Sequence, residues 1–284
     1  MPKIAVITDT DSSLPPEIAE QYGIQQVPIT IHFDDHSYTS GVDIDDRLLF
    51  ELVDRYNKLP TTSAPSPSAY SAAYESAFSQ GAESIISICV SSKVSSTYDA
   101  ALSASENFPG RDITVIDSKN LSMAQGFMAI AAAEAAQRGA SKEEVLAIVS
   151  AMGPRLQLFA VLSTLKYLAL SGRVGKFVAG MADTFNIKPI LTLDDGKLVL
   201  LERVRTRNKA VERVLELLRG NLNGKSIERL AILHINDLKR AGEFREQLCA
   251  EFHCPESILT VEFTPGLSVH AGSGGVGVVV LAGK

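Results

Sequence analysis

Tryptophan is absent from this sequence of 284 residues, and aromatic residues make up only 6% of it. Its 27 lysines and arginines are outnumbered by 33 aspartates and glutamates, which gives a formal net charge of −6. Proteins that stack nucleobases usually carry exposed aromatic side chains and clustered basic residues. The composition therefore argues against nucleic acid as a partner, and also against non-specific attraction to an anionic membrane.

Long apolar runs are missing as well. No stretch approaches the ~18 to 20 continuous apolar residues that a membrane span needs, and residues 3–7 form a strand pattern with no signal-peptide segment before it. The three cysteines, Cys89, Cys249 and Cys254, provide neither an even disulfide framework nor a CxxC motif. His253 and the cysteines near it lack the paired spacing of a zinc site. We therefore expect a cytoplasmic protein without integral membrane association, disulfide framework or bound metal.

Strand-length apolar runs alternate with helical patterns through the first half of the chain. Strand patterns cover residues 4–8, 27–33, 84–90 and 113–116, and helical patterns cover 45–56, 66–80, 121–138 and a stretch from about 96. Residues 141–144 form a capping box that opens a further helix. Such alternation predicts a mainly parallel sheet with helices on both faces.

The second half of the chain is less regular. Strands are expected at residues 159–162, 189–193, 198–204 and 230–235, and 194–197 carry the Asp-Gly turn of a hairpin. A helix must stop near Pro154. We predict an α/β fold of two α/β domains: an N-terminal domain (1–153) with a mainly parallel sheet, and a C-terminal domain (154–284) with a mixed sheet and helices.

Four loops are dense in small hydroxylated residues: 9–13, 59–67, 91–97 and 117–122. Ligands of parallel α/β sheets bind at the carboxyl ends of strands, and helix N-termini there offer N–H donors and partial positive charge. The loops therefore predict a site that holds a carboxylate or a phosphate. Ser, Thr and Asp are also the preferred N-caps of any helix, so simple capping is the commoner explanation for each loop taken alone.

Other segments carry weaker indications. The glycine-rich residues 269–277 match neither a Walker loop nor a dinucleotide fingerprint, although His270 could donate to an anion. Basic residues cluster at 171–176 and 203–209, which suggests either a docking or anion site or a solvated face. No Gly-x-Ser-x-Gly elbow is present, and we assign no catalytic residue.

Taken in order, these motifs resemble the DegV family of bacterial fatty-acid-binding proteins, over essentially the whole chain. The matching segments are residues 8–13, 60–66, 91–98, 117–119, 165–168, 172–174, 188–191, 205–207 and 270–277. The resemblance implies a lipid-binding carrier rather than an enzyme, with a long-chain fatty acid as its ligand and no cofactor. It implies that Thr62 holds the acid's carboxyl group and that Ser95 and His270 complete the grip. Neighbouring hydroxyls add three more candidate ligand-binding residues: Ser63, Ser92 and Ser96.

The resemblance also implies a partner. Family members of the carrier type present the bound acid to a separate ATP-dependent fatty acid kinase, which phosphorylates the carboxylate for phospholipid synthesis. Arg173, Arg205 and Arg207 stand where the family carries basic residues, so they would face that kinase or the phosphoryl group.

Two other functions fit the same residues. The hydroxyl-rich loops could form the phosphate cradle of a protein that binds or converts a phosphorylated small molecule. Alternatively, the chain could be a regulatory or interaction protein with a vestigial pocket. An acyl site needs a long apolar tube, whereas a phosphosugar site needs polar residues that converge on a cavity.

Overall fold

The computed structural model describes residues 3–172 and 187–284, which form two compact units. The first unit comprises Met1–Asp43 and Thr62–Pro154, and the second comprises Ile44–Thr61 and Arg155–Lys284. These units differ from the predicted domains, 1–153 and 154–284, chiefly in residues 44–61. That segment belongs to the second unit because its helix packs against a helix near the C-terminus.

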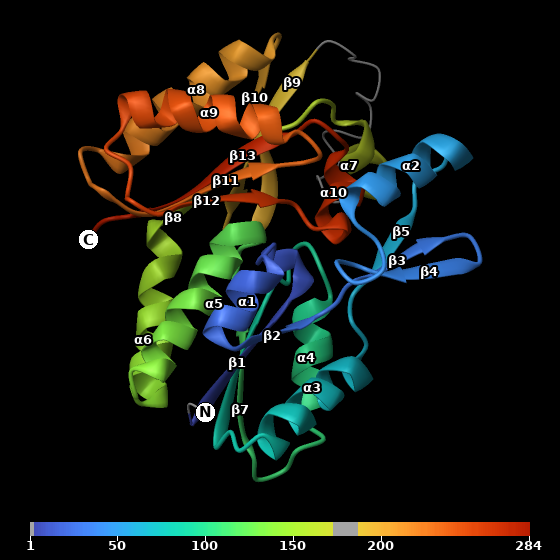
Figure 1. Ribbon diagram of the computed structural model, residues 1–284, viewed down its shortest axis with the longest axis vertical. Coiled ribbons are helices and arrows are strands. Elements are labelled where there is room, and N and C mark those ends of the chain that lie inside the picture. Colours follow the sequence, from blue (N-terminus) through green and yellow to red (C-terminus); the bar gives the residue numbers. More distant parts are fainter. Residues whose placement is uncertain (1–2, 173–186) are drawn as a thin grey trace. The chain divides into compact units, whose positions relative to one another are not determined.

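A four-stranded parallel sheet, ordered β2-β1-β6-β7, forms the centre of the first unit (Figure 1). Its strands are β1 (Ile4–Asp9), β2 (Ile24–Val27), β6 (Ser84–Cys89) and β7 (Asp112–Asp117). The carboxyl ends of these strands lie at the same edge because the strands are parallel. Three of the four hydroxyl-rich loops follow β1, β6 and β7 at this edge, as the alternating pattern predicted.

Helices cover both faces of this sheet, again as predicted. They are α1 (Pro16–Tyr22), α3 (Pro67–Ser79), α4 (Thr97–Ser105), α5 (Ser122–Gln137) and α6 (Lys142–Met152), with a short 3₁₀ helix η1 (Thr10–Ser12) after β1. Successive side chains of β1 point to opposite faces: Ile7 joins the apolar cluster that contains Tyr70 of α3, whereas Thr8 contacts Gln125 of α5. The predicted capping box at the start of α6 is confirmed, since Ser141 and Glu144 bond reciprocally.

The expectation of one strand over residues 27–33 is wrong. β2 ends at Val27, and β3 (Thr30–Phe33) lies in a separate three-stranded sheet, ordered β4-β3-β5, with β4 (His36–Thr39) and β5 (Thr61–Ser63). Pro28 stands between β2 and β3. Because proline has no N–H to donate, it interrupts the ladder and allows the chain to leave the parallel sheet.

The second unit contains a six-stranded mixed sheet, ordered β10-β9-β8-β13-β11-β12. Its strands are β8 (Leu156–Val161), β9 (Lys188–Asp194), β10 (Lys197–Val204), β11 (Ile227–His234), β12 (Ile258–Glu262) and β13 (Val276–Ala282). β11 and β12 pair in parallel, and the other neighbours pair antiparallel. The predicted hairpin is confirmed: Asp195 and Gly196 turn between β9 and β10 with φ of 44° and 80°.

Helices α8 (Arg207–Leu222) and α9 (Leu238–Glu251) lie side by side over this sheet (Figure 1). A short 3₁₀ helix, η2 (Gly153–Arg155), precedes β8, and three further helices complete the second unit: α2 (Asp46–Tyr56), α7 (Lys166–Ser171) and α10 (Pro265–Ala271). Contacts of α10 with both α2 and α7 hold these three helices together. None of the helices that the structure describes is long and apolar enough to span a bilayer.

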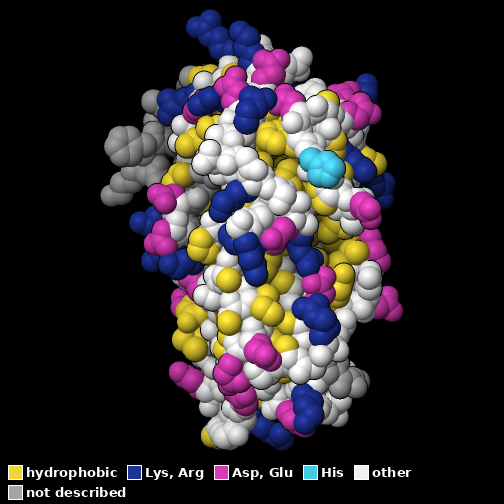
Figure 2. Space-filling view, turned by 90° about the vertical axis from the view of Figure 1, so that its left-hand side faces the viewer, with side chains coloured by type: hydrophobic (Ala, Val, Ile, Leu, Met, Phe, Trp, Pro, Cys, Tyr) yellow, Lys and Arg dark blue, Asp and Glu magenta, His cyan; other side chains and the backbone are white. Residues whose placement is uncertain are grey.

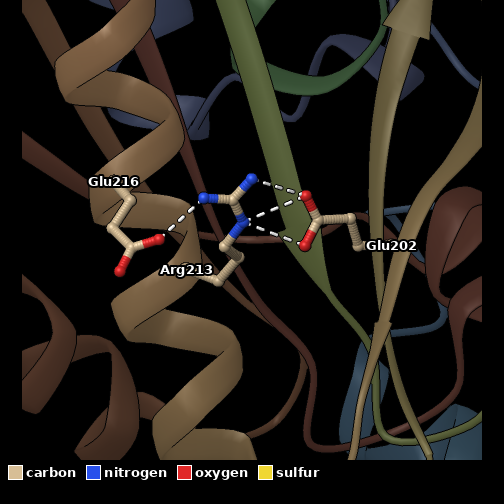
Figure 3. Close-up of polar contacts among 3 residues, drawn as sticks. All are labelled: Glu202, Arg213 and Glu216. Atoms are coloured by element: carbon tan, nitrogen blue, oxygen red, sulfur yellow. Dashed lines mark hydrogen bonds and ion pairs between the residues drawn. The ribbon is translucent and has the colours of Figure 1, made fainter.

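The surface carries charges of both signs. Figure 2 shows Lys or Arg and Asp or Glu side chains mixed over the face in view, with hydrophobic side chains in small groups between them. One such group of charges joins β10 to α8: Arg213 donates to Glu202 at 2.8 to 3.0 Å and to Glu216 at 2.7 Å (Figure 3). Exposed ion pairs of this kind add little to stability.

Cysteine pairing differs from the expectation. Cys249 in the last turn of α9 and Cys254 just beyond it form a disulfide, so the prediction that no disulfide framework is present fails for this pair. The two cysteines are five residues apart, and the bond crosses the end of α9, which lies between them. Cys89, at the end of β6, is buried and free.

Candidate functional site

A buried polar network lies at the carboxyl edge of the parallel sheet. Asp9, the last residue of β1, is 0% exposed, and its Oδ1 accepts from the Asp11 N–H at 3.0 Å. Its Oδ2 accepts from the Val90 N–H at 2.8 Å and from Gln125 Nε2 at 3.0 Å. Burial raises the pKa of Asp9 to about 6, while these hydrogen bonds act in the opposite direction. Asp9 therefore ties the loops after β1 and β6 to each other and to α5.

The loop after β6 is held by the end of β7. Asp117 Oδ1 accepts from the backbone N–H of Ser92 at 3.1 Å, and Asp117 Oδ2 accepts from Ser92 Oγ at 2.5 Å. The Lys119 N–H donates to the same carboxylate at 2.9 Å. Ser92, a predicted ligand-binding residue, thus donates its hydroxyl proton within the protein.

Ser95 and Ser96 lead from that loop into α4. The half-buried Ser95 has its Oγ 2.8 Å from Thr97 Oγ1 and accepts from the Thr97 N–H at 3.3 Å. Ser96 is exposed and is the N-cap residue of α4, but its side chain makes no capping hydrogen bond. The structure thus brings Ser92, Ser95 and Ser96 together on one loop and leaves the Ser96 hydroxyl out of the helix cap.

Thr62 and Ser63 lie on β5, and this corrects the expectation that residues 59–67 form a loop at a helix N-terminus. Ser63 Oγ is 2.8 Å from Nε2 of His32 on β3, whose Nδ1 is 2.8 Å from Ser37 Oγ on β4. Adjacent residues of a strand point to opposite sides. The side chain of Thr62, which is half-buried, therefore points away from the side on which Ser63 meets His32.

A second polar cluster lies in the second unit. Arg207 Nη2 donates to Ser163 Oγ at 2.7 Å, and Ser163 Oγ donates to the Ser273 carbonyl at 2.9 Å. Lys188 Nζ donates to the Ser163 carbonyl at 2.9 Å. Gly274 has a φ of +74°, and a Cβ there would lie 3.0 Å from Ser163 Oγ and 3.2 Å from Arg207 Nη2. Glycine is therefore required where this backbone meets the guanidinium.

Arg207 also lines a pocket of the second unit with a cavity volume of about 100 Å³. Its other lining residues include Arg240, Glu243, Asn208 and Phe244. This mixed lining is not that of a long apolar tube, and the predicted head-group residues of the first unit do not contribute to it.

The remaining predicted residues of the second unit are placed as follows. His270, expected in a loop before the final strand, lies instead in the last turn of α10 and is half-buried. Arg205 is exposed, two residues before the start of α8. Arg173 lies outside the described residues. Within residues 3–172 and 187–284, no group of three or more His, Cys, Asp or Glu side chains could hold a metal ion.

The small residues of α5 serve close packing where their surroundings are most crowded. A Cβ on Gly126 would lie 2.9 Å from the Ser12 carbonyl and 3.3 Å from Leu14 Cδ2. Gly126 thus allows the loop after β1 to approach the helix.

The sequence alone did not identify two residues of these clusters. Gln125 is the one polar side chain within residues 123–133 of α5, which otherwise hold Ala, Gly, Met, Phe and Ile, and a lone polar residue in so apolar a segment is the signal that could have identified it. Ser163 follows β8 with no motif around it, and no local pattern distinguishes it.

Known proteins match this chain over nearly its whole length. A family model described as "Uncharacterised protein, DegV family" matches residues 3–283. A solved DegV family protein from Thermus thermophilus, described by its fatty acid binding, has a TM-score of 0.92 and 29% identity, with 98% of this chain and 99% of that chain covered. DegV from Bacillus subtilis, described as a fatty acid binding protein, has a TM-score of 0.89 and 30% identity, with 99% of each chain covered. A stearic acid-binding protein from Eubacterium ventriosum has a TM-score of 0.89 and 25% identity, with 98% of each chain covered.

Proposed function

This chain belongs to the DegV family, and from that premise we propose that it binds a long-chain fatty acid in a buried apolar pocket and holds the acid's carboxyl group with neutral hydrogen-bond donors. One observation carries the proposal: solved relatives that match nearly the whole chain are described as fatty-acid-binding proteins. The same description supports a lipid carrier rather than an enzyme.

We assign the carboxyl contact to Thr62, Ser95 and His270. Ser96 is a further candidate because its exposed hydroxyl stands at the N-terminus of α4 without capping it. Ser63 and Ser92 take supporting roles, since their hydroxyls meet His32 and Asp117 respectively.

The energetics of a fatty acid favour such donors. Burial of a sixteen-carbon chain contributes on the order of 10 kcal/mol, at about 0.8 kcal/mol per CH₂. A buried carboxylate costs several kcal/mol unless its oxygens accept hydrogen bonds. Hydroxyls and helix N–H groups meet that need without a permanent ion pair, which would compete with transfer of the head group to a kinase.

Titration of the delipidated protein with stearate tests this function. We expect saturable binding of one acid per chain, and no effect of millimolar inorganic phosphate on that binding. If phosphate or a phosphorylated small molecule binds while stearate does not, the alternative of a phosphate cradle replaces the carrier.

The carrier further presents the bound carboxylate to a partner ATP-dependent fatty acid kinase, with Arg173, Arg205 and Arg207 facing the partner or the phosphoryl group. Two features support this part of the proposal: Arg205 is exposed near the start of α8, and Arg207 and Lys188 both donate to Ser163. Concentrated positive charge at a docking surface speeds association with an acidic partner and binds phosphoryl oxygens.

The variant Arg205→Ala tests the kinase step. We expect unchanged stearate affinity but slower acyl-phosphate formation in a reconstituted assay with ATP and a fatty acid kinase. Arg245→Ala, which removes an exposed arginine from α9 in the same unit, is the matched control. Equal turnover of both variants and the wild type would remove Arg205 from the docking role.

A further inference from the structure

Two buried side chains join the ends of the second unit's sequence. Ser268 Oγ, on α10, donates to Asp46 Oδ2, on α2, at 2.7 Å across a separation of 222 residues. Ser268 is 0% exposed and Asp46 is 1% exposed. This bond therefore anchors the inserted segment, residues 44–61, to the helix that carries His270.

Helix capping does not account for a carboxyl group at this place. Capping of α2 is already provided by Asp45, whose side chain accepts from the Leu48 N–H at 2.7 Å. Asp46 Oδ1 is buried and has no hydrogen-bond partner among the described residues. Burial of a carboxyl group is unfavourable when one of its oxygens makes no hydrogen bond. Buried titratable groups in such unfavourable surroundings cluster at functional sites.

The surroundings of Asp46 also disfavour its charge. The pKa of Asp46 is raised to about 8, mainly by burial and also by nearby Glu262 and Asp45, while the bond from Ser268 acts in the opposite direction. The side chain therefore remains largely protonated near neutral pH, when it can donate as well as accept.

The helix that Asp46 holds needs external support. α10 has only seven residues, and helices this short are unstable on their own. Two contacts pin it on either side of His270. Ser268, two residues before, bonds to Asp46, and Gly272, two residues after, packs so closely on the ring of Tyr167 that a Cβ would overlap the ring.

The helical repeat separates the two roles of α10. Positions two apart on an α-helix point in nearly opposite directions. The side of α10 that carries Ser268 faces α2, and His270 therefore lies on the opposite side of the helix. A shift of α10 relative to α2 would therefore move His270 directly.

We propose that Asp46 is a positioning residue that, through its hydrogen bond with Ser268, holds α10 on α2 and thereby fixes the imidazole of His270. The inference rests on the proposed function, in which His270 contributes to the grip on the fatty acid's carboxylate. It adds a residue that does not contact the ligand but determines how well His270 binds the carboxylate.

Stearate binding and histidine NMR on four variants test this role. Ser268→Ala and Asp46→Ala break the bond, Asp46→Asn keeps a neutral group of the same shape, and Asp45→Ala removes the helix cap and leaves the bond in place. We expect Ser268→Ala and Asp46→Ala to weaken stearate affinity by ~5- to 10-fold. Asp46→Asn and Asp45→Ala should stay within ~2-fold of the wild type. Should Asp46→Ala not fold, Ser268→Ala carries the same comparison.

The NMR arm isolates His270. Its ring resonance, assigned by its loss in His270→Gln, should shift in ligand-free Ser268→Ala while the resonances of the other histidines stay in place. In addition, Ser268→Ala should cause no further loss of affinity in a His270→Gln background, because both changes remove one interaction. An unmoved His270 resonance, or losses that multiply in the double variant, would overturn the proposal.

Failure of the positioning role and failure of the proposed function give different results. A wild-type protein that does not bind stearate contradicts the function, whereas the resonance of His270 in the ligand-free variants still decides whether Asp46 positions it.

Discussion

Asp9 in the first unit and Asp46 in the second are both buried, but their surroundings satisfy them to different extents. Asp9 accepts from two backbone N–H groups and from Gln125, whereas one oxygen of Asp46 accepts from Ser268 and the other has no partner among the described residues. Burial raises the pKa of Asp9 to about 6 and that of Asp46 to about 8. Asp9 thus organises the edge of a sheet. Burial of the Asp46 carboxyl group is unfavourable for the stability of the second unit, and its bond with Ser268 holds α10.

The largest effect is expected at Asp9. Asp9→Ala leaves the N–H groups of Val90 and Asp11 and the amide of Gln125 without their acceptor in a buried site. Each unsatisfied donor costs about 1 to 3 kcal/mol, so we expect a loss of about 3 to 5 kcal/mol in the free energy of unfolding. Urea denaturation measures it, and Asp99→Ala on the exposed surface of α4 is the control. A loss no larger than the control's would show that the network does not hold the edge together.

The second prediction concerns how stability depends on pH. Here the substitution is expected to stabilise the protein, whereas Asp9→Ala destabilises it. The pKa of Asp46 is raised from 3.8 in the unfolded chain to about 8 in the folded one. Its contribution to stability is therefore fully present below pH 3.8 and is lost as the pH rises through this window to about 8. Asp46→Asn removes the titration. As the pH rises from 5 to 8, the free energy of unfolding of the variant should therefore gain about 2 to 4 kcal/mol relative to that of the wild type.

Denaturation curves at pH 5, 6.5 and 8 for both proteins measure that difference. Parallel pH profiles of the wild type and Asp46→Asn would mean that Asp46 titrates normally, and the contrast with Asp9 would disappear.

The third prediction concerns ligand affinity and the residues assigned to the carboxyl group of the fatty acid. Thr62→Ala and Ser95→Ala should each weaken stearate binding by about 1 to 3 kcal/mol, because each removes a donor to a buried carboxylate. Ser79→Ala, at the exposed end of α3, should leave the affinity unchanged. Isothermal titration measures all three. Affinities within twofold of the wild type for both Thr62→Ala and Ser95→Ala would reject the assignment of the head-group site.

The smallest effect is expected at the exposed ion pairs of Arg213 (Figure 3). Hydrogen bonds from Arg213 lower the pKa of Glu202, so Arg213→Ala should return that pKa toward its ordinary value, as NMR titration would show. Stability should change less than in any variant above, because salt and water screen exposed charges. A stability loss as large as that of Asp9→Ala would contradict the view that buried polar contacts dominate here.

Local chemistry made much of the fold predictable. The capping box at Ser141 and the Asp-Gly turn at Asp195 act over a few residues, and both occur as predicted. The parallel sheet followed from the alternation of apolar runs with helical patterns. The strand over residues 27–33 failed because the apolar pattern outweighed the missing N–H of Pro28 in the prediction.

The sites were less predictable because they depend on contacts between distant residues. The loops after β1, β6 and β7 were identified from their hydroxyl content, but the part that Ser92 plays depends on Asp117 of another strand. No local pattern relates Asp46 to Ser268, which stands 222 residues away. Residues 44–61 join the second unit through this contact and others between α2 and α10, which no sequence window contains.

Mass spectrometry of the solvent extract of the purified protein tests the central claim most directly. The account predicts unesterified acids of about 14 to 20 carbons, close to one per chain, since burial of such a chain contributes on the order of 10 kcal/mol and slows its release. An extract that contains a phosphate ester and no fatty acid, from protein that also fails to take up added stearate, would contradict it.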